Sequence, residues 1–516
     1  MRPSALGQSR RDRDLETLLA SEIVDVVVVG GGITGVGVAL DAATRGLSVA
    51  LLERADLAAG TSRWSSKLIH GGLRYLATGD VALAYESARE RAVLMQRTAP
   101  HLTRALPMLM PNHRGTPWSE LASGRIGFAA GSGLRAAAGT SRSVLPPPRW
   151  VRPARATALV PTLRREDLRG GMVNWEGQLT DDARLVVAVA RTAAAYGARI
   201  VTHARVTGID HGEVHVHDGL TGAAGTVRGR TVVNATGVWA DRLDPRVELR
   251  PSKGAHLVMR GEAFGELGSA LVVPVPGQRN RYVFVLPQAP RRDGTSRVLV
   301  GLTDDAVDAV ADVPQADTAD QRFLLEVVNS TVERTVTGDD VIGSFAGLRP
   351  LLASADGTAS ADLSRRHRIL DDGEGLLTIV GGKLTTYRRM AAEVVDHLVA
   401  SYRLVAGACV TARQPLVGAI PRRRLAAIPA AAVDIARYGG EAADVERWVA
   451  SDPDLATPLY DGASHRLADV VWAMRVEGAL TTEDVVDGRL RLDQVPEERA
   501  RAEPVVRAIV EDRRSA

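Results

Sequence analysis

The chain has 516 residues, of which 45% are hydrophobic and 24% charged, and its formal net charge is +3. This is the composition of a globular protein with room for two or three domains, and the charge is too small to indicate a nucleic-acid-binding protein. The mild basicity is compatible with an anionic ligand or a membrane surface. The single cysteine, Cys409, excludes an internal disulfide and favours a reducing compartment.

The N-terminus carries basic residues but no apolar stretch after them, so it does not resemble a signal peptide. No run approaches the roughly 18 apolar residues that a membrane-spanning helix needs. We therefore expect a cytoplasmic protein that is not integral to a membrane, and attachment to the inner face of the cell membrane stays open.

Residues 1–22 are expected to form a flexible arm with one weak helix. Residues 24–53 alternate a β-branched strand, a glycine turn, a helix and a second strand, which predicts a βαβ unit. Residues 80–99 predict an amphipathic helix, whereas 100–161, rich in Pro, Gly and Arg, predict short helices and loops. Thr180 is predicted to cap a helix over 181–197. Later predicted elements are a strand meander over 198–237, four antiparallel strands within 249–302, a helix over 317–336, a hairpin over 368–382, a helix over 384–402 and helices from about 412 to the C-terminus.

The strongest motif is Gly30-Gly31-Gly32-Ile33-Thr34-Gly35 between the first strand and the first long helix. In such a turn Gly30 leaves the strand, Gly32 lets the backbone approach a pyrophosphate, and Gly35 lets helix and strand pack closely. The phosphates then lie at the helix N-terminus. Glu53, about 20 residues on, is placed to accept hydrogen bonds from ribose hydroxyls. Its charge would repel a 2′-phosphate, so NADP is disfavoured, while NAD and FAD both remain open.

A second candidate is the stretch SSKLIHGGLRY, residues 65–75. No second G-x-G-x-x-G follows the first, which argues against an enzyme that binds two dinucleotides. Hydroxyls and glycine amides here can instead hold a pyrophosphate and the edge of a flavin ring, and the candidate cofactor residues are Ser65, Ser66, Lys67, His70, Gly71 and Gly72. Arg74 and Tyr75 then point past the flavin toward a substrate. His70 leaves open whether a flavin is covalently attached.

Two further turns have small residues at the end of a strand. In the first, Asn234 to Gly237, the backbone can approach a cofactor closely. In the second, Gly381 and Gly382 precede a helix whose N-terminus favours negative charge, which suits a reduced flavin. Lys383 stands beside this turn.

These stretches together resemble the FAD-dependent glycerol-3-phosphate dehydrogenase family. The resemblance rests on VVVVGGGITGVGVALDAATRGLSVALLE, SSKLIHGGLRY, VNATGVW, KGAH, GLRPL and GGKLTTYR, which lie within residues 24–402, and on VVWAMRVEGALTTEDVV in the tail. It implies an α/β fold with a Rossmann-like FAD-binding domain of the D-amino-acid-oxidase-like type, an antiparallel-sheet substrate domain and a C-terminal helical domain. The expected domains are 23–99, 170–245 and 337–402 for FAD, 100–169 and 246–336 for the substrate, and 412–516 for the helices.

The resemblance implies oxidation of sn-glycerol 3-phosphate to dihydroxyacetone phosphate, with FAD as cofactor, no metal, and a quinone or similar electron acceptor. The implied substrate positions are Arg74, Tyr75, Arg349, Arg365 and Lys383. A phosphate carries nearly two negative charges, so several convergent cations suit it independently of the resemblance. His256 in KGAH, or Arg349 through hydrogen bonds, is expected to take or stabilise the hydroxyl proton.

The sequence departs from the family pattern in three places. Arg366 follows Arg365 where an acidic residue is common, so which basic side chain of this stretch reaches the ligand is open. Trp64 stands where a small residue is expected beside the flavin loop. The arm before Val24 has no counterpart in the family pattern.

The family usually delivers its electrons to membrane quinone. Residues 125–139 and 421–439 combine basic and apolar side chains and are candidate lipid contacts, although core-facing helices are the more common explanation of such patterns. We also expect a homo-oligomer, a dimer, and no nucleic-acid partner. Two alternatives remain: an enzyme of the same fold acting on a 2-hydroxy acid or amino acid, and a non-catalytic flavin-binding sensor. An oxygen-using oxidase variant is a third.

Overall fold

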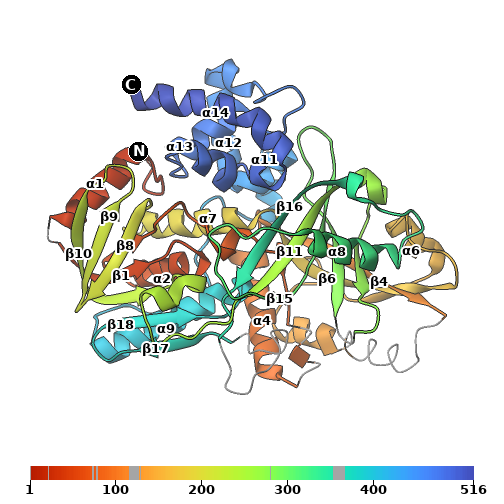
Figure 1. The fold of residues 1–516 in the computed structure, drawn as a ribbon, viewed down its shortest axis with the longest axis horizontal. Coiled ribbons are helices and arrows are strands. Elements are labelled where there is room, and N and C mark those ends of the chain that lie inside the picture. The colour runs from red at the N-terminus through yellow and green to blue at the C-terminus, as the bar shows by residue number, and fades with distance from the viewer. Residues whose placement is uncertain are drawn as a thin grey trace.

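The computed structural model describes residues 2–20, 22–72, 75–76, 79–114, 127, 130–278, 281–352 and 366–515. A largely parallel sheet forms one half of the molecule (Figure 1), and its strand order is β17-β18-β10-β1-β2-β7. Its parallel strands are β1 (Ile23–Val29), β2 (Val49–Leu52), β7 (Arg199–Val201), β10 (Ala224–Asn234) and β18 (Leu376–Val380). Antiparallel partners extend it: β17 (Arg368–Asp371), β9 (Glu213–Asp218) and β8 (Ala204–Asp210). The predicted βαβ unit, strand meander and hairpin are confirmed.

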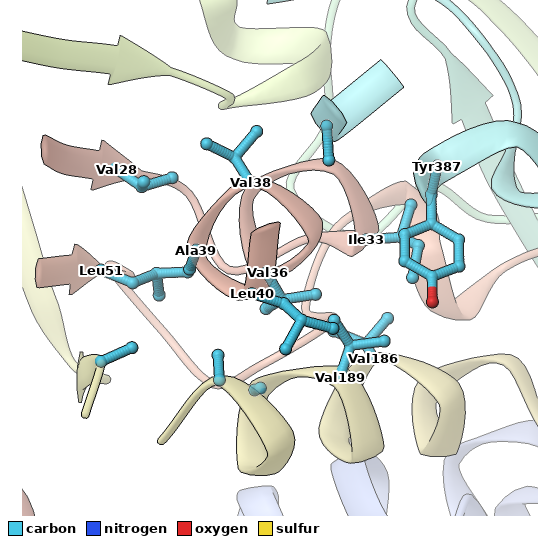
Figure 2. Packing of buried hydrophobic residues seen from close by; sticks show 14 of the residues in the cluster. Val28, Ile33, Val36, Val38, Ala39, Leu40, Leu51, Val186, Val189 and Tyr387 are labelled. Carbon is cyan, nitrogen blue, oxygen red and sulfur yellow. The ribbon is translucent and has the colours of Figure 1, made fainter. Parts of the chain in front are cut away.

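Helices α2 (Ile33–Thr44), α7 (Asp182–Ala195) and α9 (Tyr387–Tyr402) pack beside this sheet. Val36 and Leu40 of α2 point toward Val186 and Val189 of α7 (Figure 2), and all four are buried. On its other flank α2 approaches α9 closely, where a Cβ on Gly37 would lie 3.0 Å from the Tyr387 ring. This packing fixes the start of α2 at the carboxyl end of β1.

A second sheet forms the other half of the molecule, with the order β15-β11-β14-β13-β12-β4-β6-β3. Adjacent strands are antiparallel except β4 and β12. The strands are β3 (Leu68–Ile69), β4 (Thr103–His113), β6 (Leu168–Leu179), β11 (Ser252–Arg260), β12 (Ala270–Pro274), β13 (Tyr282–Pro287), β14 (Arg297–Gly301) and β15 (Asp305–Ala306), with β16 (Val341–Arg349) paired to β11 and β5 (Arg149–Val151) to β6. Helices α6 (Pro153–Leu159) and α8 (Thr318–Asn329) contact this sheet, and α4 (Val81–Val93) follows β3 in the chain.

A helical unit at the C-terminus lies above both sheets (Figure 1, blue). It contains α10 (Arg422–Leu425), α11 (Ala432–Tyr438), α12 (Ala442–Ser451), α13 (Leu467–Arg475) and α14 (Pro496–Ser515). Its apolar residues form two clusters of their own, around Trp472 and around Val485. Within the described residues, every helix is too short or too polar to cross a bilayer.

The N-terminal segment differs from the expected flexible arm. Residues Gln8–Leu19 form helix α1, whose Leu15 and Leu18 are buried against the first sheet. Arg11 is 3% exposed and forms an ion pair with Asp218 at the end of β9. The weak helix expected in this arm is present, but its packing against the sheet was not predictable, because its apolar residues are few and burial of a long-range ion pair has no local signature.

Three other expectations are wrong in detail. The cap of α7 is Asp181, whose side chain accepts from the backbone N–H of Arg184, rather than Thr180. Residues 103–113, expected among short helices and loops, form the long strand β4, in which Pro107 and Pro111 lie outside the two residues that pair with β12. Strands β3, β6 and β16 lie mostly in ranges assigned to the FAD domain but pair within the second sheet.

Candidate active site

The glycine turn after β1 is built by close backbone approach. Gly30 has a positive φ of 112°, and a Cβ there would lie 2.6 Å from the carbonyl oxygen of Ala235. A Cβ on Gly35 would overlap with the carbonyl oxygen of Gly30. Around Gly32, in contrast, Ser62 Oγ at 3.2 Å is the one described heavy atom within 4 Å of such a Cβ. Gly30 and Gly35 are therefore required by packing, and Gly32 borders open space.

Glu53 ties the end of β2 to this turn. Its carboxylate accepts a hydrogen bond of 2.6 Å from the N–H of Gly31 and another of 2.8 Å from the N–H of Ala55. Burial raises the pKa of Glu53, which these two donors oppose. Helix α2 begins beside it at Ile33, and its N-cap, Gly32, supplies no side-chain hydrogen bond to the helix end.

The loop before β3 turns its polar groups toward Asp182 at the start of α7. The N–H and hydroxyl of Ser65 both donate to Asp182 Oδ2, at 2.9 and 2.7 Å. Lys67, at a positive φ of 58° and 4% exposed, places Nζ 3.1 Å from Asp182 Oδ1. Burial alone would raise the pKa of Asp182, but Lys67 and Arg491 outweigh it and lower this pKa. Ser65 and Lys67 thus shape the loop, and their contact with a cofactor stays a prediction.

His256 lies on β11, between β14 and β16 of the second sheet, and is 2% exposed. Its Nε2 lies 2.8 Å from the Oγ of Ser66, and its ring stacks on Phe345 of β16 at 4.8 Å between centroids. The other ring nitrogen, Nδ1, is buried and has no hydrogen-bond partner among the residues that the structure describes. Burial, together with the charges of Lys67 and Arg349, lowers the pKa of His256 to about 3. The imidazole is therefore neutral at physiological pH.

Arg349 lies at the end of β16, next to β11. Its Nη1 donates to Asp304 Oδ1 at 2.7 Å and to Ser252 Oγ at 3.0 Å, and its Nη2 donates to the carbonyl of Thr303 at 3.3 Å. A Cβ on Gly254 would overlap with this guanidinium. Arg349 is thus held in one orientation, and 24% of its side chain is exposed.

Tyr75 and Lys383 lie close together although 308 residues separate them in the chain. Lys383 Nζ lies 3.7 Å from the centre of the Tyr75 ring and 3.5 Å from Ser87 Oγ. Arg366 forms two hydrogen bonds to Asp80 at the start of α4, at 2.8 and 3.0 Å. Arg74 and Arg365 lie outside the described residues, so their predicted roles have no structural counterpart here.

The remaining predicted cofactor positions lie in turns. Gly72, Gly237, Gly381 and Gly382 all have positive φ values, between 63° and 81°. The N–H of Gly71 donates to Glu176 on β6 at 3.1 Å, and the His70 ring lies 6.4 Å from that of Phe284. The contacts of these residues with a cofactor stay predictions.

Four neighbours of the site were missed by sequence reasoning: Asp182, Glu176, Phe345 and Asp304. Only Asp182 had a signal, as one of two carboxylates at the start of a predicted helix. Trp64, noted as a departure, packs against the backbone of Gly347, where a Cβ would lie 2.7 Å from the Trp64 Cβ, and its ring lies 5.6 Å from Phe345. It therefore fills the space beside the strand that carries Phe345.

The residues present fit FAD. The start of α2, where the N–H of Ile33 donates to Ser62 Oγ at 2.9 Å, and the open space at Gly32 suit a pyrophosphate, and Glu53 suits a ribose. The orphaned Nδ1 of His256 is a buried polar atom that lacks a protein partner.

Comparison with known proteins agrees with this geometry. A family model described as FAD dependent oxidoreductase matches residues 25–388. The chain is 44% identical over 512 residues to glycerol-3-phosphate dehydrogenase 1 of Mycobacterium tuberculosis, with 98% of each chain covered. It is 34% identical over 417 residues to the aerobic glycerol-3-phosphate dehydrogenase of Staphylococcus haemolyticus, covering 78% of this chain and 72% of that one.

The fold is also similar to a solved structure, the glycerol-3-phosphate dehydrogenase of Bacillus halodurans complexed with FAD. The TM-score is 0.73 at 26% identity, and 98% of both chains is covered. The similarity therefore extends over the helical C-terminal region as well as both sheets.

Proposed function

Because this chain belongs to the family of FAD-dependent oxidoreductases, we propose that it binds FAD and oxidises sn-glycerol 3-phosphate to dihydroxyacetone phosphate. The names of its relatives and the cationic site support this substrate. When bound, FAD supplies a hydride acceptor for carbon 2 of the substrate. The protein must then remove the proton of the hydroxyl on that carbon and hold the phosphate.

His256 is the proposed proton acceptor. A guanidinium stays protonated in proteins, so Arg349 can donate hydrogen bonds but cannot serve as a base. The neutral imidazole of His256 has one nitrogen next to Ser66 and a second, Nδ1, without a protein partner. A bound dianionic phosphate would offset Lys67 and Arg349, two of the causes that lower the pKa of His256, and so would make it a better base.

Arg349 and Lys383 are the described members of the proposed phosphate site, with Arg74 and Arg365 as its further predicted members. Arg349 is positioned before any ligand binds, because Asp304, Ser252 and the Thr303 carbonyl hold it. Such preorganisation reduces the entropy lost on binding.

The observation that carries the proposal is the buried His256, on which the charge of Arg349 acts and whose Nδ1 has no hydrogen-bond partner in the described part of the chain, in a chain of this family. Anaerobic mixing of the purified protein with sn-glycerol 3-phosphate should bleach the flavin absorbance. Glycerol, lactate, 2-hydroxyglutarate and glycine serve as controls. Bleaching by a hydroxy acid or by glycine, but not by glycerol phosphate, would transfer the assignment to another enzyme of this fold.

The proposed electron acceptor is a quinone or similar compound, reached by peripheral contact with the inner face of the membrane. Exposed Arg423 and Arg424 on α10 support this contact. Binding to anionic vesicles that weakens with salt would support it, and no binding at low salt would contradict it. We also propose a homodimer, which light scattering at several protein concentrations tests.

A further inference from the structure

The C-terminal helical unit reaches the candidate site through one short segment, residues 484–495, which we call the clamp segment. It contains a π-helical turn, η10 (Asp484–Arg489), and a 3-10 turn, η11 (Leu492–Gln494). Between them Arg491 adopts a left-handed conformation with φ of 59°. π-helical turns are rare and often occur at functional sites.

Arg489 holds the loop that follows β2. Its side chain is 1% exposed, both of its terminal nitrogens bond the carboxylate of Asp56, and one of them also donates to the carbonyl of Glu477 at 2.9 Å. A Cβ on Gly488 would overlap with the same carboxylate. Asp56 comes three residues after Glu53, the proposed ribose ligand.

Arg491 holds the loop that precedes β3. Its Nη2 donates to the carbonyl of Arg63 at 2.5 Å, and its Nε lies 3.3 Å from Asp181 Oδ2. The guanidinium also lies 5.1 Å from the Trp64 ring and 4.0 Å from Asp182. Asp182 in turn binds Ser65 and Lys67, so one arginine supports this loop through its backbone and through its anchoring carboxylates.

The end of the clamp segment packs with the apolar residues next to His256. Val495 belongs to the same buried cluster as Trp64 and Phe345, and Phe345 stacks on His256. The carbonyl of Gln494 lies so close to Gly343 on β16 that a Cβ there would overlap with it. The clamp segment is therefore continuous with the packing of both loops and of β16.

We propose that the clamp segment is a positioning device for FAD. Arg489 fixes the loop that carries Glu53, and Arg491 fixes the loop that carries Ser65 and Ser66. Removing one partner of a buried ion pair leaves an uncompensated charge, so loss of either arginine frees its loop. Coupling of this kind is reciprocal, hence FAD binding also stabilises the docking of the helical unit. The inference rests on the cofactor of the proposed function and not on its substrate.

Arg491→Met and Arg489→Met test this proposal, with Arg491→Lys as the conservative variant. The matched control is Arg184→Met. Arg184 is also buried and also joins α7 to the helical unit, through two bonds to Glu477 at 2.9 and 3.2 Å. Within the described residues, the hydrogen bonds of its side chain go to Glu477 and to the carbonyl of Arg437 rather than to residues 53–67. The dissociation constant for FAD, measured on apoprotein by fluorescence, should rise about tenfold or more for both test variants. It should change less than about twofold for Arg184→Met, and Arg491→Lys should bind FAD more tightly than Arg491→Met.

A measurement on the unaltered chain covers the case in which a variant does not fold. Adding FAD to the apoprotein should slow hydrogen exchange in residues 484–495 and leave α12, whose buried residues belong to the separate cluster around Trp472, unchanged. Unchanged exchange in the clamp segment, or equal loss of FAD affinity in the control and test variants, would overturn the proposal. An unaltered protein that binds FAD but ignores glycerol phosphate would contradict the proposed substrate alone.

Discussion

The Nε2 of His256 lies 2.8 Å from the Oγ of Ser66, although 190 residues separate the two in the chain. This contact fixes the ring of the proposed base through one nitrogen, while the other, Nδ1, is buried and has no hydrogen-bond partner among the described residues. Ser66 precedes Lys67, whose left-handed backbone turns the loop at this point. The loop proposed to hold the cofactor thus also orients the proposed base.

Replacing Ser66 with alanine is expected to lower kcat/KM for glycerol phosphate moderately. One neutral hydrogen bond contributes about 1 kcal/mol, so the loss should be roughly fivefold. Ser66→Thr retains the hydroxyl and should recover part of it. Steady-state assays with the affinity for FAD measured in parallel separate the two roles of Ser66: an unchanged kcat with weaker FAD binding would show that Ser66 acts only on the cofactor.

His256→Asn is expected to reduce kcat by about 100-fold or more, because general-base catalysis commonly contributes at least this much. His101→Asn is the matched control. His101 is also buried, and burial likewise lowers its pKa to about 3, but its neighbours are Gly418 and Gly439 near the helical unit. Equal kcat for both variants would contradict the assignment of His256.

The acid stability of the protein should depend on the same histidine. The pKa of His256 falls from 6.5 to about 3 on folding, so between these values the unfolded chain binds one proton more than the folded chain. The contribution of His256 to stability is therefore fully present above pH 6.5 and declines as the pH falls toward 3. His256→Asn removes this contribution, which is up to about 1.4 kcal/mol per pH unit. In thermal unfolding experiments, stability should fall less between pH 7 and pH 5 in the variant than in the unaltered protein. An equal fall in both would be inconsistent with a neutral buried imidazole.

The fold was predictable where its determinants are adjacent in the chain. The valine run, the glycine turn and helix α2 follow one another within 22 residues, from Ile23 to Thr44, and their period and spacing predict a βαβ unit. Strand β4 was hidden because Pro107 and Pro111 interrupt the pattern of a strand. The weak helix expected within residues 1–22 is present as α1, but its packing was not predictable because it depends on contacts with distant segments.

The candidate site was predictable in its residue types but not in its pairings. Ser65 and Lys67 were chosen for a cofactor, yet the structure turns both toward Asp182, which lies 117 and 115 residues away. A local pattern carries no information about which distant carboxylate a loop will meet. The same holds for Arg349, whose partner Asp304 lies 45 residues earlier.

The glycines of the phosphate turn should separate stability from cofactor binding. Gly35→Ala places a Cβ on the carbonyl of Gly30 and should destabilise the fold by about 1–3 kcal/mol. Gly32 has φ of −75° and ψ of 176°, which alanine adopts freely, and its Cβ would meet only Ser62 Oγ among the described atoms. Gly32→Ala should therefore keep the melting temperature of the apoprotein while weakening FAD. A melting temperature that falls equally in both variants would show that Gly32 too is needed for packing.

Arg349→Met and Lys383→Met should weaken glycerol phosphate far more than glycerol, because glycerol lacks the charge that these cations are proposed to bind. A hydrogen bond to a charged group contributes about 1.5–3 kcal/mol, so kcat/KM for glycerol phosphate should fall roughly 10- to 100-fold in each variant. Arg334→Met is the matched control, since Arg334 forms an exposed ion pair with Asp340 outside the site.

The Arg349 variant has a second possible cause of weaker binding, because it leaves Asp304 without its ion-pair partner and this carboxylate would repel a phosphate. The double variant Arg349→Met with Asp304→Asn removes that repulsion. If Arg349 binds the phosphate directly, the double variant stays as weak as the single one, whereas recovery toward the unaltered KM would assign the loss to Asp304. An equal loss for glycerol and glycerol phosphate in all of these variants would mean that neither cation holds the phosphate.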